Sequence, residues 1–220
     1  MLIGHYGASL AAKALDRRIP LWVLFVAAQL VDIFWVIFLS LGVEKIRITP
    51  HFTASNDIDN YYIPFTHGAL PTLGWALLGF AGYRALCRYR GWAGAAWVVA
   101  LVVLSHWAFD LIVHVPDLPL LGDHHKVGFG LWNHKPLAFM TELAFVLVGG
   151  GFYLARLGPG RTLNNKKGLL GLILLLLILC TVNYYGPAQT TVQQVLLGAV
   201  AVYGLLTALV AWLEARGWIG

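Results

Sequence analysis

Three residues of the kind that bind metals recur at four-residue spacing inside an apolar stretch of this chain. They are His106, Asp110 and His114, and most residues between them are apolar. Because four residues exceed one helical turn by only about 40°, the three side chains would form one polar stripe along a helix. Imidazole and carboxylate groups are common ligands of zinc and of other borderline divalent metals. The stripe therefore favours a metal site, in which the carboxylate between two histidines could bridge two ions.

The composition of the chain indicates a membrane protein. Of its 220 residues, 59% are hydrophobic and 11% are charged, whereas roughly a quarter of the residues of a soluble domain are charged. An ionisable group in hydrocarbon is costly, and it persists where it meets a metal, water or another ionisable group. The net charge of +5 does not indicate a nucleic-acid partner, because the basic residues gather in short segments between apolar runs.

Apolar segments of about 20 residues, the length that crosses a bilayer, predict an all-α integral membrane protein with six transmembrane helices. These spans lie at 20–43, 66–86, 92–115, 137–155, 168–186 and 192–213. Residues 2–15 are too few to span and are expected to form a short half-span helix at the N-terminus. We expect a single membrane domain over residues 1–220, in which 1–155 form the metal-site core and 156–220 add two apolar spans.

Basic residues alternate between the two ends of the predicted spans, which gives an orientation. They gather around 13–18, 84–90, 156–167 and 214–216, whereas the polar loops at 44–65 and 116–136 are mixed or acidic. By the positive-inside rule, the basic ends and the C-terminus lie in the cytoplasm. The two polar loops, and any site beneath them, then face the external side.

Depth in the membrane places ionisable residues from distant segments in one layer. At about 1.5 Å per helical residue from the nearest basic end, six of them fall in the outer half of a hydrocarbon core about 30 Å thick. These residues are His5, Asp32, His67, His106, Asp110 and Glu142. We expect the first five to bind metal. Asp110, Glu142 and His114, which lies one turn nearer the external mouth, are the candidates for catalysis.

Simpler interpretations of the same residues remain open. A single histidine in a membrane helix is most often a satisfied polar contact, and His114 is equally an interfacial histidine, a ligand of a second metal or an acid–base group. The candidates for substrate binding in the loops are Asp59, His125, Lys126 and Asn133. Of these, Asp59 suits a helix cap as well, and Lys126 suits an ordinary solvated lysine.

The motifs resemble those of a known family. Gly4-His5, a helical Asp32, Pro64-Phe65-Thr66-His67 and Ser105-His106-x3-Asp110 resemble the LexA-regulated, membrane-bound metal-dependent hydrolases. That family groups with zinc-dependent phospholipase C and the zinc single-strand nucleases. The resemblance covers roughly residues 1–155. It implies a bacterial protein in which His5, Asp32, His67, His106 and Asp110 bind zinc, with Asp110 as a bridge.

The chain departs from the family pattern at two places. Asp32 is followed by Ile33 and Phe34, where the commoner form has a second acidic residue, and Ala138 stands four residues after His134 in place of a carboxylate. We therefore expect one or two zinc ions, or another divalent metal, rather than a complete site of three metals.

These observations predict a membrane-embedded, zinc-type hydrolase resembling phospholipase C. It would lie in the bacterial cytoplasmic membrane and attack a phosphoester of a lipid or amphiphile from the outer leaflet, through metal-activated water. One alternative is a proton or divalent-metal transporter or channel, although few polar residues besides Gln29 continue below the site. Another is a metal-binding membrane protein without turnover. A haem carrier is disfavoured, because carboxylates crowd the histidines. The sequence gives no oligomeric state.

Overall fold

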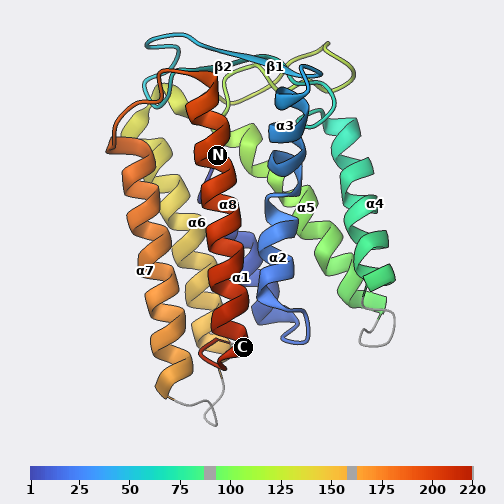
Figure 1. The fold of residues 1–220 in the computed structure, drawn as a ribbon, viewed down its shortest axis with the longest axis vertical. Coiled ribbons are helices and arrows are strands. Elements are labelled where there is room, and N and C mark those ends of the chain that lie inside the picture. Colours follow the sequence, from blue (N-terminus) through green and yellow to red (C-terminus); the bar gives the residue numbers. More distant parts are fainter. Residues whose placement is uncertain (87–92, 158–162, 220) are drawn as a thin grey trace.

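The computed structural model describes residues 1–86, 93–157 and 163–219, which form a helical bundle with a small sheet across one end (Figure 1). The α-helices are α1 (Tyr6–Leu15), α2 (Leu21–Ala28), α3 (Leu30–Ser40), α4 (Ala69–Leu86), α5 (Ala93–Val113), α6 (Lys135–Arg156), α7 (Leu163–Tyr185) and α8 (Val192–Ala215). The strands are β1 (Lys45–Ile48) and β2 (Ile58–Tyr62), and a short 3-10 helix, η1, covers Leu131–Asn133. The fold is mostly helical, as the sequence predicts.

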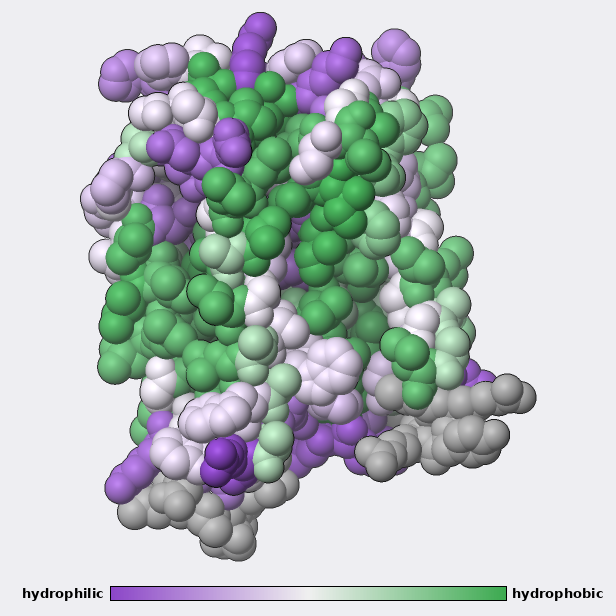
Figure 2. Space-filling model, in the orientation of Figure 1, coloured by the Kyte–Doolittle hydropathy of each residue, from purple (hydrophilic) through white to green (hydrophobic). Residues whose placement is uncertain are grey.

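Four helices are long and apolar enough to cross a membrane: α5, α6, α7 and α8. Figure 2 shows a broad hydrophobic band across one face of the molecule, with hydrophilic side chains at both ends. The number becomes five if α2 and α3 count as one broken span. The helix α4, predicted as a span at 66–86, is not among them. The fold is compatible with a membrane protein, but the prediction of six spans is not confirmed.

The first predicted span is not one straight helix. It breaks at Gln29 into α2 and α3, whose axes differ by 50°. The last carbonyls of a helix lose their helical partners, and that of Ala28 accepts a hydrogen bond from His106 Nδ1 at 2.7 Å. The Gln29 amide donates to the Leu2 carbonyl oxygen at 2.8 Å. The break thus replaces helical hydrogen bonds by contacts with the polar centre of the bundle.

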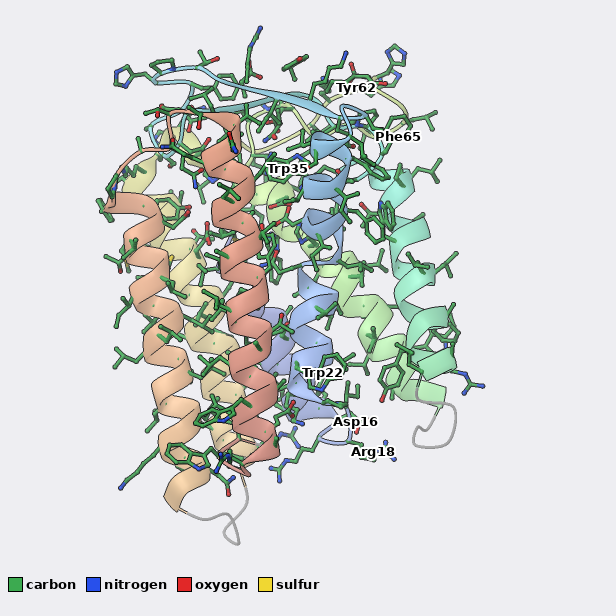
Figure 3. All side chains as sticks on the ribbon, viewed as in Figure 1. Asp16, Arg18, Trp22, Trp35, Tyr62 and Phe65 are labelled. Atoms are coloured by element: carbon green, nitrogen blue, oxygen red, sulfur yellow. The ribbon has the colours of Figure 1, made fainter. Side chains whose placement is uncertain are left out.

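The polar loop predicted at 44–65 contains the antiparallel hairpin of β1 and β2, so the expectation of an all-α fold is wrong in this segment. The β-branched and aromatic residues at these positions favour strands. Arg47 pairs with Asp59 in the register, and Lys45 with Tyr62. Tyr62 and Phe65 lie at this end of the bundle, and Trp22, Asp16 and Arg18 lie at the other (Figure 3).

Polar contacts close the end of the bundle opposite the hairpin. Lys13 Nζ lies 2.9 Å from Glu214 Oε1 at the end of α8, and Glu214 also accepts the backbone N–H groups of Leu21 and Trp22 at the start of α2. The Arg18 guanidinium donates to Asp16 and holds the pKa of that carboxyl below its usual value. Basic residues at 87–90 and 158–162, used above to orient the chain, lie outside the described residues.

The short N-terminal helix is present as α1, and it packs closely against α6 through glycine. A Cβ atom at Gly149 would clash with the backbone of Gly7, and one at Gly7 would clash with the carbonyl of Phe145. A Cβ at Gly151, two residues further along α6, would meet no atom within 4 Å. The contact matters for the site, because α1 begins directly after His5.

Gly149→Ala is expected to push α1 away from α6 and to lower the free energy of unfolding by about 1–3 kcal/mol, as overpacking does. The matched control is Gly151→Ala, which should leave stability unchanged or raise it by about 0.5–1 kcal/mol through helix propensity. Thermal unfolding of both variants in the same detergent measures the difference. Equal stability of the two would contradict this packing.

Candidate metal centre

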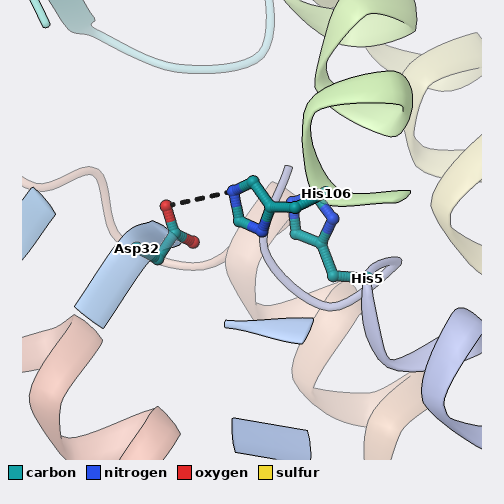
Figure 4. Close-up of side chains that lie close together, drawn as sticks. All are labelled: His5, Asp32 and His106. Carbon is teal, nitrogen blue, oxygen red and sulfur yellow. Dashed lines mark ion pairs between the residues drawn. The ribbon is translucent and has the colours of Figure 1, made fainter. Parts of the chain in front are cut away.

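The five predicted ligands come from four separate segments and meet inside the bundle. His5 precedes α1, Asp32 lies in the first turn of α3, His67 precedes α4, and His106 and Asp110 lie on α5. None is more than 7% exposed. Figure 4 shows how the side chains of Asp32, His106 and His5 converge. The depth argument from the sequence therefore identifies a set of residues that the fold brings together.

The two carboxylates face the same pair of imidazoles. His67 Nε2 lies 3.2 Å from Asp32 Oδ1 and 3.8 Å from Asp110 Oδ2. His106 Nε2 lies 3.5 Å and 3.1 Å from the same two oxygens. Each of these two imidazole nitrogens thus lies within 4 Å of an oxygen of both carboxylates.

In His67 and His106, the hydrogen bond made by Nδ1 shows that this nitrogen carries a proton. His106 Nδ1 contacts the Ala28 carbonyl oxygen, which can only accept, so Nδ1 carries the proton. The Thr66 hydroxyl donates to Glu44 Oε2 at 2.6 Å and therefore accepts from His67 Nδ1 at 2.9 Å. In the neutral rings, Nε2 then presents its lone pair to the carboxylates. Metal-binding histidines are held by such contacts.

His5 lies on the other side of His106. The two rings stack with their centroids 3.8 Å apart and their planes 8° apart. His5 Nε2 lies 3.2 Å from Asp110 Oδ1, and the α-amino group of Met1 lies 2.6 Å from that same oxygen. The two oxygens of Asp110 therefore face different groups, which is the geometry that a bridging carboxylate needs.

Several polar atoms of this group lack partners. Within the part of the chain that the structure describes, Asp110 Oδ2, His106 Nε2 and both nitrogens of His5 are buried and accept or donate no hydrogen bond. Lone pairs that face one another in an apolar interior are costly unless a cation lies between them. Two sets of ligand atoms lie within 4.8 Å of one another, namely His5, Asp32 and His106, and His67, His106 and Asp110. These buried residues could hold a metal ion.

His114 lies beside the group, four residues after Asp110 and directly after the end of α5. Its Nδ1 contacts Asp117 Oδ1 at 2.8 Å, and its Nε2 lies 3.7 Å from Asp110 Oδ1. The ring packs against Trp132, with centroids 4.0 Å apart. The structure thus aims this nitrogen at the carboxylate, and the catalytic role of His114 stays a prediction.

Both oxygens of Glu142 are engaged by other groups. Oε2 accepts the backbone N–H groups of Leu2, Ile3 and Gly4 at 3.3, 3.0 and 2.9 Å, and Oε1 accepts the Tyr184 hydroxyl at 2.9 Å. The side chain therefore holds the segment that carries His5. The structure places it outside the ligand group, and its catalytic role remains a prediction without a contact in its support.

The predicted substrate-binding residues lie in the polar segments at the hairpin end. Asp59 pairs with Arg47 at 2.6 Å, and Lys126 pairs with Asp123 at 2.8 Å and donates to the Tyr61 carbonyl oxygen. His125 and Asn133 are exposed. These side chains lie in the segments at the hairpin end rather than among the ligands.

Sequence analysis missed residues that hold the ligands in place: Glu44, Thr66, Asp117 and Tyr203. The Tyr203 hydroxyl donates to Asp32 Oδ2 at 2.8 Å. Two of these residues could have been found from the sequence, because Thr66 adjoins His67 and Asp117 stands three residues after His114. Glu44 and Tyr203 are remote in sequence from their partners, and no spacing pointed to them.

Glu142→Ala is expected to release residues 2–5 and to lower the free energy of unfolding, because each buried N–H left without an acceptor costs about 1–3 kcal/mol. Glu142→Gln, whose amide oxygen still accepts from the backbone, should retain most of the stability. Amide hydrogen exchange at residues 2–5 and thermal unfolding measure both effects. Normal protection of these amides in Glu142→Ala would contradict the holding role.

No protein-family model, no curated protein and no solved structure matches this chain. What the site does must therefore be argued from its own residues.

Proposed function

We propose that this chain is a membrane-embedded, metal-dependent hydrolase that acts on a phosphoester of a lipid or amphiphile. The observation that carries the proposal is the set of four ligand atoms that face one another in a buried site: Asp32 Oδ1, Asp110 Oδ2, His67 Nε2 and His106 Nε2. Histidine nitrogens and carboxylate oxygens suit zinc, and a catalytic zinc would also keep one position open for water. A bound zinc ion would lower the pKa of its water to about 7 and so supply a nucleophile at neutral pH.

A second ion is proposed on the other face of Asp110, where it would displace the α-amino group of Met1, which lies 2.6 Å from Oδ1. The same oxygen lies 3.2 Å from His5 Nε2. Two ions that share a carboxylate suit in-line displacement at phosphorus, since they can stabilise the attacking and the leaving oxygen together. We therefore propose one or two zinc ions, with Asp110 as the shared ligand.

His114 is the residue best placed to move a proton. Asp117 holds its Nδ1, so the proton that the ring exchanges is the one on Nε2, on the side of Asp110. It lies at the end of α5 that faces the hairpin and the polar loops. We propose that it serves a leaving group or a water molecule that approaches from this end.

Two apolar grooves support a substrate with hydrocarbon chains. One, of about 370 Å³, lies between α4 and α5 and is lined by Leu73, Leu104 and Trp107 among others. The second, of about 380 Å³, is lined by residues of α3 and α4, including Trp75. The indole N–H groups of both tryptophans donate to backbone carbonyls of the segment that carries His67, at 3.0 and 2.9 Å. Chains of a lipid in these grooves would lie next to the metal ligands.

The end of the bundle that holds the hairpin is proposed to face outward. Arg18 lies near the opposite end (Figure 3), and Lys13, which contacts the Arg17 carbonyl oxygen, belongs to the same basic segment. The positive-inside rule places the cytoplasm at this end. The metal ligands then belong to the outer leaflet of a bacterial cytoplasmic membrane, and the C-terminus lies inside.

Purified protein is expected to carry one or two equivalents of zinc, and His106→Ala should lose most of it, because removal of one ligand opens the site. His124→Ala, which removes an exposed loop histidine, is the matched control and should keep its metal. Elemental analysis after size exclusion measures the content. Metal-free wild-type protein that does not take up zinc would mean that protons on the imidazoles satisfy the carboxylates, and would end the proposal.

Zinc-loaded protein in mixed micelles is expected to hydrolyse phospholipids or amphiphilic phosphoesters. Chelation should abolish turnover and added zinc should restore it, while His114→Ala should lower the rate about 10²–10⁴-fold as loss of an acid–base group does. A panel of phosphoesters measures the rate, with His124→Ala as control. Zinc flux into liposomes without any hydrolysis would instead support a transporter.

A further inference from the structure

The two C-terminal helices each bring one phenol hydroxyl to a buried carboxylate of the centre. Tyr203 of α8 donates to Asp32 Oδ2 at 2.8 Å, and Tyr184 of α7 donates to Glu142 Oε1 at 2.9 Å. Tyr203 is 7% exposed and Tyr184 is 4% exposed. The sequence places no predicted site residue in these two apolar helices. The two hydrogen bonds connect both helices to the centre.

The hydrogen bond from Tyr203 gives the two oxygens of Asp32 different partners. Oδ1 faces the Nε2 atoms of His67 and His106 at 3.2 and 3.5 Å, while Oδ2 accepts the phenol hydroxyl. An oxygen that accepts a strong hydrogen bond has less electron density to offer a metal. The carboxylate is therefore prepared to bind through Oδ1 alone.

We infer that Tyr203 is a positioning residue of the metal centre, which keeps Asp32 a one-oxygen ligand and so keeps the coordination number of a bound metal low. This inference rests on the proposed metal centre and deepens it. It also makes α8 part of the site, although the segment 156–220 lies outside the stretch that carries the ligands. A low coordination number matters for hydrolysis, because a catalytic metal needs a position for water or substrate beside its protein ligands.

The ring of Tyr203 is held independently of its hydroxyl group. It packs in an apolar cluster that includes Trp35 and Val36 of α3 and Val195 and Ala199 of α8. Phenylalanine would keep these contacts and remove only the hydrogen bond. Tyr203→Phe is therefore a clean test of the hydroxyl.

The experiment replaces zinc with cobalt, whose visible absorption is strong in four-coordinate sites and weak in sites of higher coordination. Wild-type protein is expected to show the strong absorption. Tyr203→Phe should show a weaker, shifted spectrum, because Oδ2 becomes free to bind, and its zinc affinity should fall about 10–100-fold, as when the partner of a ligand is removed. Tyr185→Phe is the matched control, because it removes an exposed phenol hydroxyl from α7 and should change neither measurement.

Each outcome has a distinct meaning. If wild-type protein binds neither cobalt nor zinc, the proposed metal centre itself fails. If Tyr203→Phe binds zinc with wild-type affinity and gives the wild-type cobalt spectrum, the centre stands and the role of Tyr203 is wrong. Should Tyr203→Phe not fold, X-ray absorption of zinc-loaded wild-type protein decides. Four ligands with a one-oxygen carboxylate support the inference, and a two-oxygen Asp32 overturns it.

Discussion

The structure depends on holding two carboxylates, Asp32 and Asp110, side by side in an apolar bundle. Burial of a single carboxylate costs several kcal/mol after relaxation of its surroundings, and two neighbouring carboxylates also repel. Imidazoles, a phenol and the α-amino group of Met1 offset this cost, because all of them lie within hydrogen-bond or ion-pair distance of these oxygens. The break between α2 and α3 and the non-helical segments that carry His5 and His67 all supply contacts to this group.

Two glutamates accept hydrogen bonds from the backbone next to two of the ligand histidines. His5 and His67 lie outside helices, in segments whose backbone N–H groups have no helical partner, and irregular backbone at membrane depth is tolerated only where protein groups satisfy it. Glu142 accepts the N–H groups of Ile3 and Gly4 before His5, and Glu44 accepts those of Phe65 and Thr66 before His67. Of the carboxylates near the site, Asp32 and Asp110 face the histidines, whereas Glu44 and Glu142 hold the segments that carry them.

The sequence predicts which buried histidines and aspartates converge, and it predicts the residues that support them poorly. Helical rise is uniform, so counting residues from the basic ends is enough to place His5, Asp32 and Asp110 in one layer. Spacing cannot show whether a carboxylate such as Glu142 faces a metal or backbone N–H groups, because both lie at the same depth. Nor can hydropathy reveal the break at Gln29, since the residues on both sides of it are equally apolar. These features depend on partners that are distant in the sequence.

The charge of the group includes a cation that the chain itself supplies. The α-amino group of Met1 lies 2.6 Å from Asp110 Oδ1, and His5 Nε2 lies 3.2 Å from the same oxygen. The contacts of His67 with Thr66 and of His106 with Ala28 engage Nδ1, so the Nε2 atoms are left to face Asp32 and Asp110. In an interior of low dielectric constant, a group whose charges cancel is far less costly to bury than one with net charge. The negative charge of the two carboxylates is therefore balanced in part by this ammonium group and in part by what binds between the Nε2 atoms and the carboxylates, a proton or a metal ion.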